Sequence, residues 1–257
     1  MQFFKYQSLG NDFILFDFYS NKEPSFFNSD KAKKICDRRF GIGADGVLIL
    51  TKKSFPKIEI FNADGTNGEM CLNGLRCVAL HLFTKHNFPS NFKIEMSSKL
   101  INCRIEKNLE IQTNIELSNY KGKKTITISN VDYIGHVALA PNPHFIVFKK
   151  VPLEWLKNNG QLFERHESFP HGTNVEFIWK NENNKYEMLV YERGCGITLS
   201  CGSGTIAAFT TLLKLKKIDA QVDTIIKMPG GSLKCGLYEN KINLKSAAFF
   251  IFSGQIK

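Results

Sequence analysis

The strongest constraint on the fold is an internal duplication. Short motifs recur in the same order at a spacing of about 130 residues, and a constant spacing is the signature of a repeated structural unit. With 257 residues, the chain is long enough for two domains of about 125 residues that each bury a core. The paired segments are 11–16 with 142–148, 43–49 with 172–178, 61–65 with 191–194, and 71–74 with 201–204.

The apolar pattern predicts the same elements in each half. Short apolar segments bounded by Gly, Asn and Pro indicate strands, at 47–50, 58–61, 145–148 and 186–191. A helix follows each repeated cysteine and is apolar around most of its circumference, so it should lie inside a sheet. We therefore expect an α/β (α+β) fold with two pseudo-symmetric domains, each a mostly antiparallel sheet wrapped around a central helix. The expected domains are 1–115, joined by the returning C-terminal strand 249–257, and 116–248.

Composition excludes several classes of protein. The net charge is +10, but the basic residues are scattered and no nucleic-acid-binding motif accompanies them, so we expect no nucleic-acid partner. No apolar run approaches the roughly 20 residues that span a bilayer, so we expect no membrane association. The N-terminus lacks the features of a signal peptide, which favours a cytoplasmic protein.

The seven cysteines do not form a recognisable framework. Their number is odd and no Cys-x-x-Cys pair occurs, so we expect neither a disulfide scaffold nor a metal site. Cys77, Cys103, Cys195 and Cys235 are interpreted as structural. The segment 41–46 matches the glycine pattern of dinucleotide-binding loops, but it opens a strand-like run instead of a helix, which excludes that interpretation.

Cys71 and Cys201 occupy matched positions, each at the start of a predicted helix. Unpaired N–H groups there bind carboxylates and favour a thiolate. Duplication should turn the two helix starts toward each other, with a thiol on each side of a substrate carbon. This pattern predicts inversion next to a carboxylate: one thiolate removes the α-proton and the other thiol returns a proton to the opposite face.

Several motifs make the chain similar to a known family over nearly its whole length. It resembles diaminopimelate epimerase at residues 9–13, 41–46, 61–65, 73–77, 142–144, 191–194 and 201–204. The resemblance implies interconversion of LL- and meso-diaminopimelate in lysine and peptidoglycan biosynthesis, with no cofactor, neither pyridoxal phosphate nor metal. It also implies a small-molecule substrate and a homodimer. Phe252 stands where the family often has a tyrosine implicated in dimer packing.

The resemblance also assigns the site. Cys71 is implied as proton donor and Cys201 as acceptor, supported by His144 and Glu192. Leu72 stands where the family usually has glycine, but its main-chain donor is retained. The implied substrate contacts are the side chains of Asn11, Asn62, Asn142, Asn174, Glu192 and Arg193, and the backbone N–H groups of Leu72, Asn73, Gly202 and Ser203.

Two alternatives remain open at this stage. The chain could be a racemase or epimerase for another amino acid. It could also be a binding or structural homologue without activity, although the intact cysteine pair argues against this.

Overall fold

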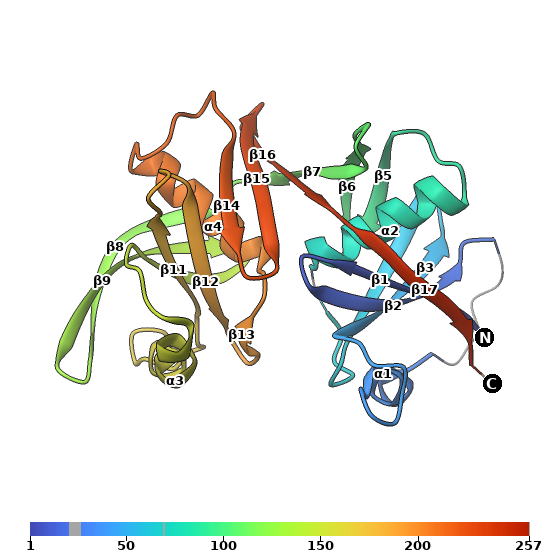
Figure 1. Cartoon of the computed structure of the whole chain (residues 1–257), viewed down its shortest axis with the longest axis horizontal. Coiled ribbons are helices and arrows are strands. Elements are labelled where there is room, and N and C mark those ends of the chain that lie inside the picture. Colours follow the sequence, from blue (N-terminus) through green and yellow to red (C-terminus); the bar gives the residue numbers. More distant parts are fainter. Residues whose placement is uncertain (21–26, 69, 257) are drawn as a thin grey trace. The chain divides into compact units, whose positions relative to one another are not determined.

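The computed structural model describes residues 1–20, 27–68 and 70–256. The chain divides into two compact units, which are Met1–Asn114 with Lys245–Lys257, and Ile115–Leu244 (Figure 1). Both units combine strands with helices, and the predicted α/β fold is confirmed. Among the described residues, no helix is both long and apolar enough to cross a membrane.

The first unit is built on a mostly antiparallel sheet. Its described strands pair in the order β17–β1–β2–β3–β4–β5–β6–β7, with the β2–β3 and β4–β5 pairs parallel and the other pairs in this order antiparallel. The C-terminal strand thus joins the N-terminal one. The strands are β1 (Gln2–Ser8), β2 (Asn11–Phe18), β3 (Gly46–Lys52), β4 (Pro56–Asn62), β5 (Asn91–Met96), β6 (Lys99–Ile105), β7 (Glu110–Glu116) and β17 (Phe249–Gln255).

The second unit repeats this pattern. Its strands pair in the order β8–β9–β10–β11–β12–β14–β15, with β10–β11 and β12–β14 parallel, and β13 pairs with β12. The strands are β8 (Asn119–Ile128), β9 (Val131–Ala140), β10 (Asn142–Val147), β11 (Asn174–Lys180), β12 (Tyr186–Glu192), β13 (Gly196–Thr198), β14 (Thr224–Met228), β15 (Gly231–Tyr238) and β16 (Lys241–Ala247), which runs across the boundary at Leu244.

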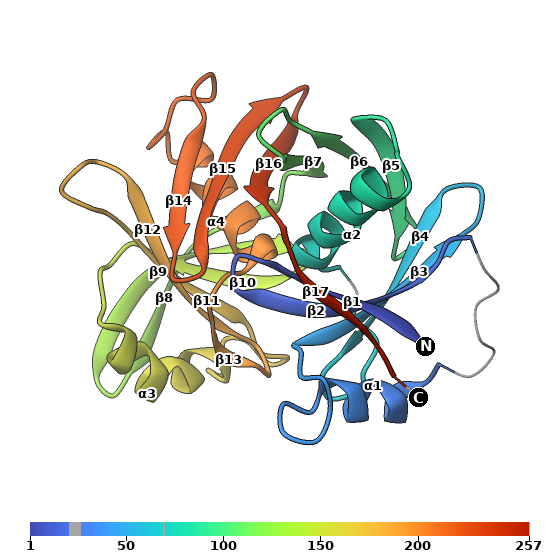
Figure 2. The ribbon, with the colours of Figure 1, turned by 45° about the vertical axis from the view of Figure 1, so that its right-hand side comes forward.

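Each unit holds one buried helix against its sheet. Helix α2 (Leu72–Lys85) contacts strands β1 to β6 and β17, and Figure 2 shows it alongside β5 and β6. Helix α4 (Gly202–Lys214) contacts β8 to β11. Both helices are buried along most of their length, which explains why the sequence is apolar on nearly every side of them.

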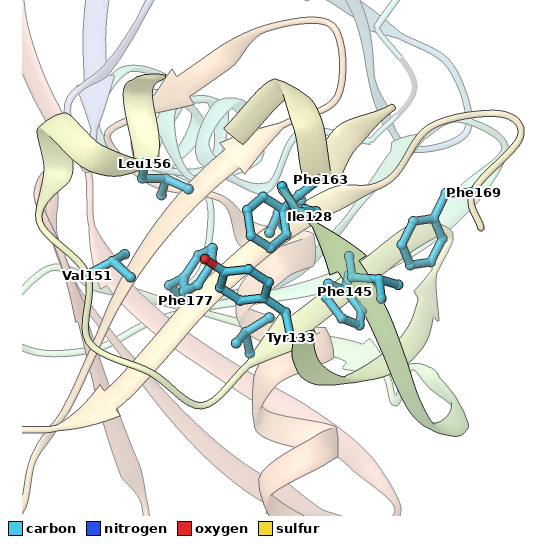
Figure 3. Packing of buried hydrophobic residues seen from close by; sticks show 11 residues of the cluster. Ile128, Tyr133, Phe145, Val151, Leu156, Phe163, Phe169 and Phe177 are labelled. Atoms are coloured by element: carbon cyan, nitrogen blue, oxygen red, sulfur yellow. The ribbon is translucent and has the colours of Figure 1, made fainter. Parts of the chain in front are cut away.

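The outer face of each sheet is covered by a second helix, α1 (Ser29–Cys36) or α3 (Leu153–Glu164). Figure 3 shows the aromatic core under α3, where Phe163 meets Phe177 edge-on with ring centroids 5.4 Å apart. Phe145 and Phe177 face this core. Because side chains alternate along a strand, their neighbours His144 and Glu176 point to the other face, toward α4.

Candidate active site

Cys71 begins α2 and caps it. The residue is extended, with φ −123° and ψ 102°, and its sulfur accepts the N–H of Gly74 at 3.5 Å. The Cys71 sulfur therefore accepts the capping hydrogen bond that a Ser or Asp side-chain oxygen usually accepts at the N-cap position. Leu72 and Asn73 belong to the first turn of the helix, where backbone N–H groups are suited to an anion.

Asparagine side chains surround this thiol. The Cys71 thiol donates to Asn11 Oδ1 at 3.7 Å, and Asn73 Nδ2 donates to the same oxygen at 3.4 Å. Asn73 in turn accepts from Arg76, a fully buried side chain whose Nε donates to Ser8 Oγ at 3.0 Å. The structure therefore brings Asn11, Asn73 and Cys71 together on a rigid support.

Hydrogen bonds also hold the side chains of Asn11 and Asn62, two of the predicted substrate contacts. The amide of Asn11 also donates to Asp45 Oδ2 at 2.8 Å, which fixes the orientation of the side chain. Asn62 lies exposed at the end of β4, where its amide donates to Thr66 Oγ1 at 2.9 Å. Asn62 is thus held by a local turn and is open to solvent.

Cys201 begins α4 in the same way. Its φ and ψ are −132° and 116°, and its sulfur accepts the N–H of Gly204 at 3.3 Å. The hydroxyl of Ser203 lies 3.3 Å from the sulfur. The two repeated cysteines therefore share one backbone conformation and one capping contact.

The electrostatic environment of Cys201 corrects one sequence-based expectation. The helix start was expected to favour the thiolate, and the contacts with Ser203 and Gly204 do act in that direction. Burial and the negative charges of Glu192 and Glu176 outweigh them, so the pKa of Cys201 lies well above its ordinary value. Burial and charge therefore favour the thiol form of Cys201.

Glu192 at the end of β12 lies beside this thiol. Thr198 Oγ1 donates to Glu192 Oε1 at 2.6 Å. Burial raises the pKa of Glu192, and hydrogen bonds from Thr198 and Cys201 oppose the shift. The charge of Glu176 raises this pKa further, whereas that of His144 lowers it. Glu192, Cys201 and the His144–Glu176 pair thus form one electrostatic cluster.

His144 and Glu176 are paired inside the second unit. His144 Nδ1 lies 2.6 Å from Glu176 Oε1, and both side chains are completely buried. His144 lies within β10, whereas the strand predicted from the sequence began at residue 145. Within the described part of the chain, His144 Nε2 and Glu176 Oε2 have no hydrogen-bond partner.

A separate network joins three predicted substrate residues. Arg193 donates from its guanidinium to Asn142 Oδ1 at 2.9 Å and from its backbone to Asn174 Oδ1 at 3.0 Å. Asn174 Nδ2 donates to the carbonyl of Pro143 at 3.1 Å. The structure therefore brings Asn142, Asn174 and Arg193 together at the ends of β10, β11 and β12.

The four cysteines interpreted as structural fall into two groups. Cys77, Cys103 and Cys235 are buried, as a structural role requires. Cys195 is exposed in the turn between β12 and β13, unlike the other three. Cys195 is flanked by Arg193-Gly194 and Gly196, which belong to a tight turn. Counting cysteines along the sequence does not reveal such a turn.

Comparison with known proteins decides the family. The family model described as diaminopimelate epimerase matches residues 3–125 and 138–247. The chain belongs to the diaminopimelate epimerase family. The resemblance drawn from the motifs is therefore confirmed, and so is the assignment of the chain as an epimerase enzyme.

Relatives within the diaminopimelate epimerase family match along almost their whole length. The diaminopimelate epimerases of Prochlorococcus marinus and Rippkaea orientalis are each 34% identical, over 99% of this chain and 98% of the relative. That of Clostridium perfringens is also 34% identical, over 99% of this chain and 98% of its own.

Solved structures share the fold of this epimerase at low identity. A probable proline racemase from Agrobacterium radiobacter superimposes with a TM-score of 0.76 at 12% identity, covering 100% of this chain and 92% of the other. A phenazine biosynthesis protein from Bacillus anthracis gives a TM-score of 0.76 at 12% identity, covering 100% and 99%.

Sequence reasoning missed two residues of this epimerase's second unit, Glu176 and Thr198. Both were visible as polar residues in or next to short apolar runs, but no local pattern linked them to the surroundings of Cys201. A glutamate inside an otherwise apolar strand was the available signal, because a charged residue is almost never fully buried without a partner.

Proposed function

We propose that this protein interconverts LL- and meso-2,6-diaminopimelate, with Cys71 and Cys201 as its acid–base pair. The observation that carries the proposal is the matched placement of the two cysteines. Each caps a buried helix through the N–H of a glycine three residues later, at 3.5 Å and 3.3 Å. Four relatives of this length that share about a third of its residues are diaminopimelate epimerases, which supports the substrate.

The chemistry is a two-proton exchange without a covalent intermediate. One cysteine, as thiolate, takes the α-hydrogen as a proton, and the electron pair left on the α-carbon delocalises into the substrate carboxylate. The other cysteine, as thiol, gives its proton to the opposite face of that carbon. The configuration is then inverted, and the two sulfurs have exchanged protonation states.

The configuration of the substrate decides which cysteine acts as base, because the base must face the α-hydrogen. The resemblance to the family assigned donation to Cys71 and acceptance to Cys201, and the reversible reaction exchanges these roles. Burial and the charges of Glu192 and Glu176 raise the pKa of Cys201, which favours its thiol form.

Helix-start amides supply the main stabilisation of the developing charge. The N–H groups of Leu72, Asn73, Gly202 and Ser203 belong to the first turns of α2 and α4. Preorganised donors of this kind stabilise a carboxylate that gains negative charge and need no reorganisation during the reaction. Leu72 serves as well as glycine here, because its side chain is buried and only its backbone is required.

The polar side chains at the strand ends fit the second amino-acid end of the substrate. Arg193, Asn142 and Asn174 offer both charge and amide groups beyond what a single α-centre needs. We assign the remaining contacts to Asn11, Asn62 and Glu192. This set accounts for a substrate with a carboxylate and an ammonium group at each end.

We further propose a homodimer formed through β17. Four consecutive apolar side chains of this strand, Phe249 to Phe252, have exposed fractions of 53%, 44%, 50% and 45%. A second copy of the chain would cover this surface, since contiguous exposed apolar residues mark association sites. We place the enzyme in the cytoplasm, in lysine and peptidoglycan synthesis. We also propose that it needs no other macromolecular partner, no metal and no pyridoxal phosphate.

The substrate assignment is tested by a panel of amino acids. The purified protein is incubated with LL-diaminopimelate, alanine, proline and glutamate, and the stereoisomers are separated chromatographically. We expect rapid conversion of LL- to meso-diaminopimelate and little turnover of the others, because each buried polar group left unpaired costs about 1–3 kcal/mol. Comparable turnover of proline or alanine would instead support an epimerase of another specificity.

A further inference from the structure

The pair His144–Glu176 breaks the symmetry of the duplication. In the first unit, Phe13 lies opposite Gly46 across the parallel β2–β3 pair. In the second unit, His144 lies opposite Asn174 across the parallel β10–β11 pair. Two residues farther along, Leu48 of the first unit therefore matches Glu176 of the second.

The glycines of the two central helices confirm this correspondence. A Cβ built on Gly74 would meet Leu48 Cδ2 at 2.9 Å and Phe13 at 3.7 Å. A Cβ built on Gly204 would meet Glu176 Oε1 at 2.5 Å. Under the helix start of Cys71 lie a phenylalanine and a leucine, whereas a histidine and a glutamate occupy the same places under Cys201.

The hydrogen-bonding capacity of the His144–Glu176 pair is only partly used among the described residues, unlike that of a purely structural pair. His144 and Glu176 are fully buried and share one hydrogen bond of 2.6 Å. Their far atoms, His144 Nε2 and Glu176 Oε2, have no partner in the described part of the chain. Buried polar atoms are nearly always paired, so an unpaired ring nitrogen in a catalytic cluster points to a group that arrives with the substrate.

We propose that Glu176 is a positioning residue that holds His144 in one tautomer for the proton transfer at Cys201. The Glu176 carboxylate accepts the proton of His144 Nδ1, and this leaves Nε2 as the nitrogen that faces the reacting groups. Gly204 lets the carboxylate approach the first turn of α4, where the helix dipole favours negative charge. This inference rests on the proposed function.

A histidine whose tautomer is fixed by a buried carboxylate is a recurring device in acid–base catalysis. The carboxylate orients the ring and stabilises its correct tautomer without exchanging its own proton. Glu176 shares a hydrogen bond of 2.6 Å with the imidazole, which orients the ring, and its charge also acts on Cys201 and Glu192. The matching places of the first unit hold Phe13 and Leu48, which makes the surroundings of the two cysteines chemically different.

Two variants separate the charge of Glu176 from its hydrogen bond. Glu176→Leu copies the residue found at the matching place in the first unit and removes the acceptor. Glu176→Gln keeps an acceptor and removes the charge. Glu187→Gln is the matched control, because Glu187 lies on β12 of the same unit and accepts from Asn181 at 3.1 Å.

The kinetic measurement is the rate of diaminopimelate epimerisation. We expect Glu176→Leu to lower kcat by about 100-fold with little change in KM. The reason is that His144, as an acid–base group, would lose the carboxylate that orients it. Glu176→Gln should lose less, and Glu187→Gln nothing. In a His144→Asn background, Glu176→Leu should cause no further loss, because the effect of Glu176 passes through His144.

The spectroscopic measurement does not depend on activity. Long-range ¹H–¹⁵N spectra of ¹⁵N-histidine-labelled protein report the tautomer of each ring, and His144→Asn identifies the His144 signals. We expect the Nδ1–H form in the wild-type protein and in Glu176→Gln, and its loss in Glu176→Leu. Failure of the proposed function would abolish epimerisation but leave this result in place.

Three outcomes would overturn the inference. The first is an unchanged kcat in Glu176→Leu. The second is a His144 ring that carries its proton on Nε2 in the wild-type protein. The third is a full additional loss when both residues are replaced. If Glu176→Leu does not fold, the tautomer of the wild-type protein and the kcat of Glu176→Gln decide the question.

Discussion

Gly204 lies directly against the carboxylate of Glu176, and a Cβ at Gly204 would come within 2.5 Å of Glu176 Oε1. In the other unit, a Cβ at Gly74 would approach a methyl group of Leu48 at 2.9 Å. The methyl group can rotate away, whereas Oε1 is held by its hydrogen bond to His144. The same substitution should therefore have different effects in the two units.

Gly204→Ala should lower the free energy of unfolding by about 1–3 kcal/mol, the usual cost of overpacking a core. It should also lower kcat, because the carboxylate must move away from its place beside His144. Gly74→Ala should cost less, since Leu48 adjusts and alanine favours the helix. Urea unfolding and steady-state kinetics on both variants measure this, and equal losses would contradict it.

The ionisation of Cys201 can be followed directly. Burial and the charges of Glu192 and Glu176 raise the pKa of this thiol, so its thiolate should appear only at a pH above the usual range of a cysteine thiol. The measurement is the difference in absorbance at 240 nm between the wild-type protein and Cys201→Ser during a pH titration. A Cys201 thiolate already present near pH 7 would show that the helix start outweighs burial and charge.

The sequence predicted those parts of the site that depend on local chain geometry. Cys71 and Cys201 were identifiable because a helix start and a repeat are both local patterns. Glu176 was not identifiable in this way. The spacing of the repeat aligns Glu176 with Val47 of the first half, whereas the strand register aligns it with Leu48. The raised pKa of Cys201 depends on burial by residues far along the chain, which a local pattern does not contain.

Acid should destabilise the first unit through Asp17. Burial acts to raise the pKa of Asp17, but hydrogen bonds from His81, the Tyr19 amide and His86 outweigh it and hold the pKa at about 2. A carboxyl with a lowered folded-state pKa stabilises the fold above its unfolded pKa, and this contribution disappears as the pH falls from about 4 to 2.

The expected contribution of Asp17 is about 2 kcal/mol at neutral pH. Asp17→Asn should therefore unfold at lower urea concentration than the wild-type protein at pH 7, and the difference should shrink toward pH 2. Urea titrations at several pH values measure it. A difference that stays constant over this range would show that the stabilisation does not come from the charge of Asp17.

The proposed dimer predicts a change in mass. Ile251 is 50% exposed on β17, and Ile251→Lys should convert the dimer to a monomer by placing a charge in an apolar interface. Ile225→Lys is the control, since Ile225 is 42% exposed on β14 of the other unit. Light scattering during size-exclusion chromatography gives the masses. A wild-type monomer, or an Ile251→Lys dimer, would contradict the proposed interface.

The two-cysteine mechanism is tested most directly by epimerisation of LL-diaminopimelate in D₂O. The wild-type protein should form the meso isomer with deuterium at the inverted α-carbon, because the returned proton comes from a thiol that exchanges with solvent. Cys71→Ser and Cys201→Ser should each lower this rate by about 10²–10⁴-fold, and the buried Cys77→Ser should retain it. Near-normal inversion by either of the first two variants would contradict the mechanism.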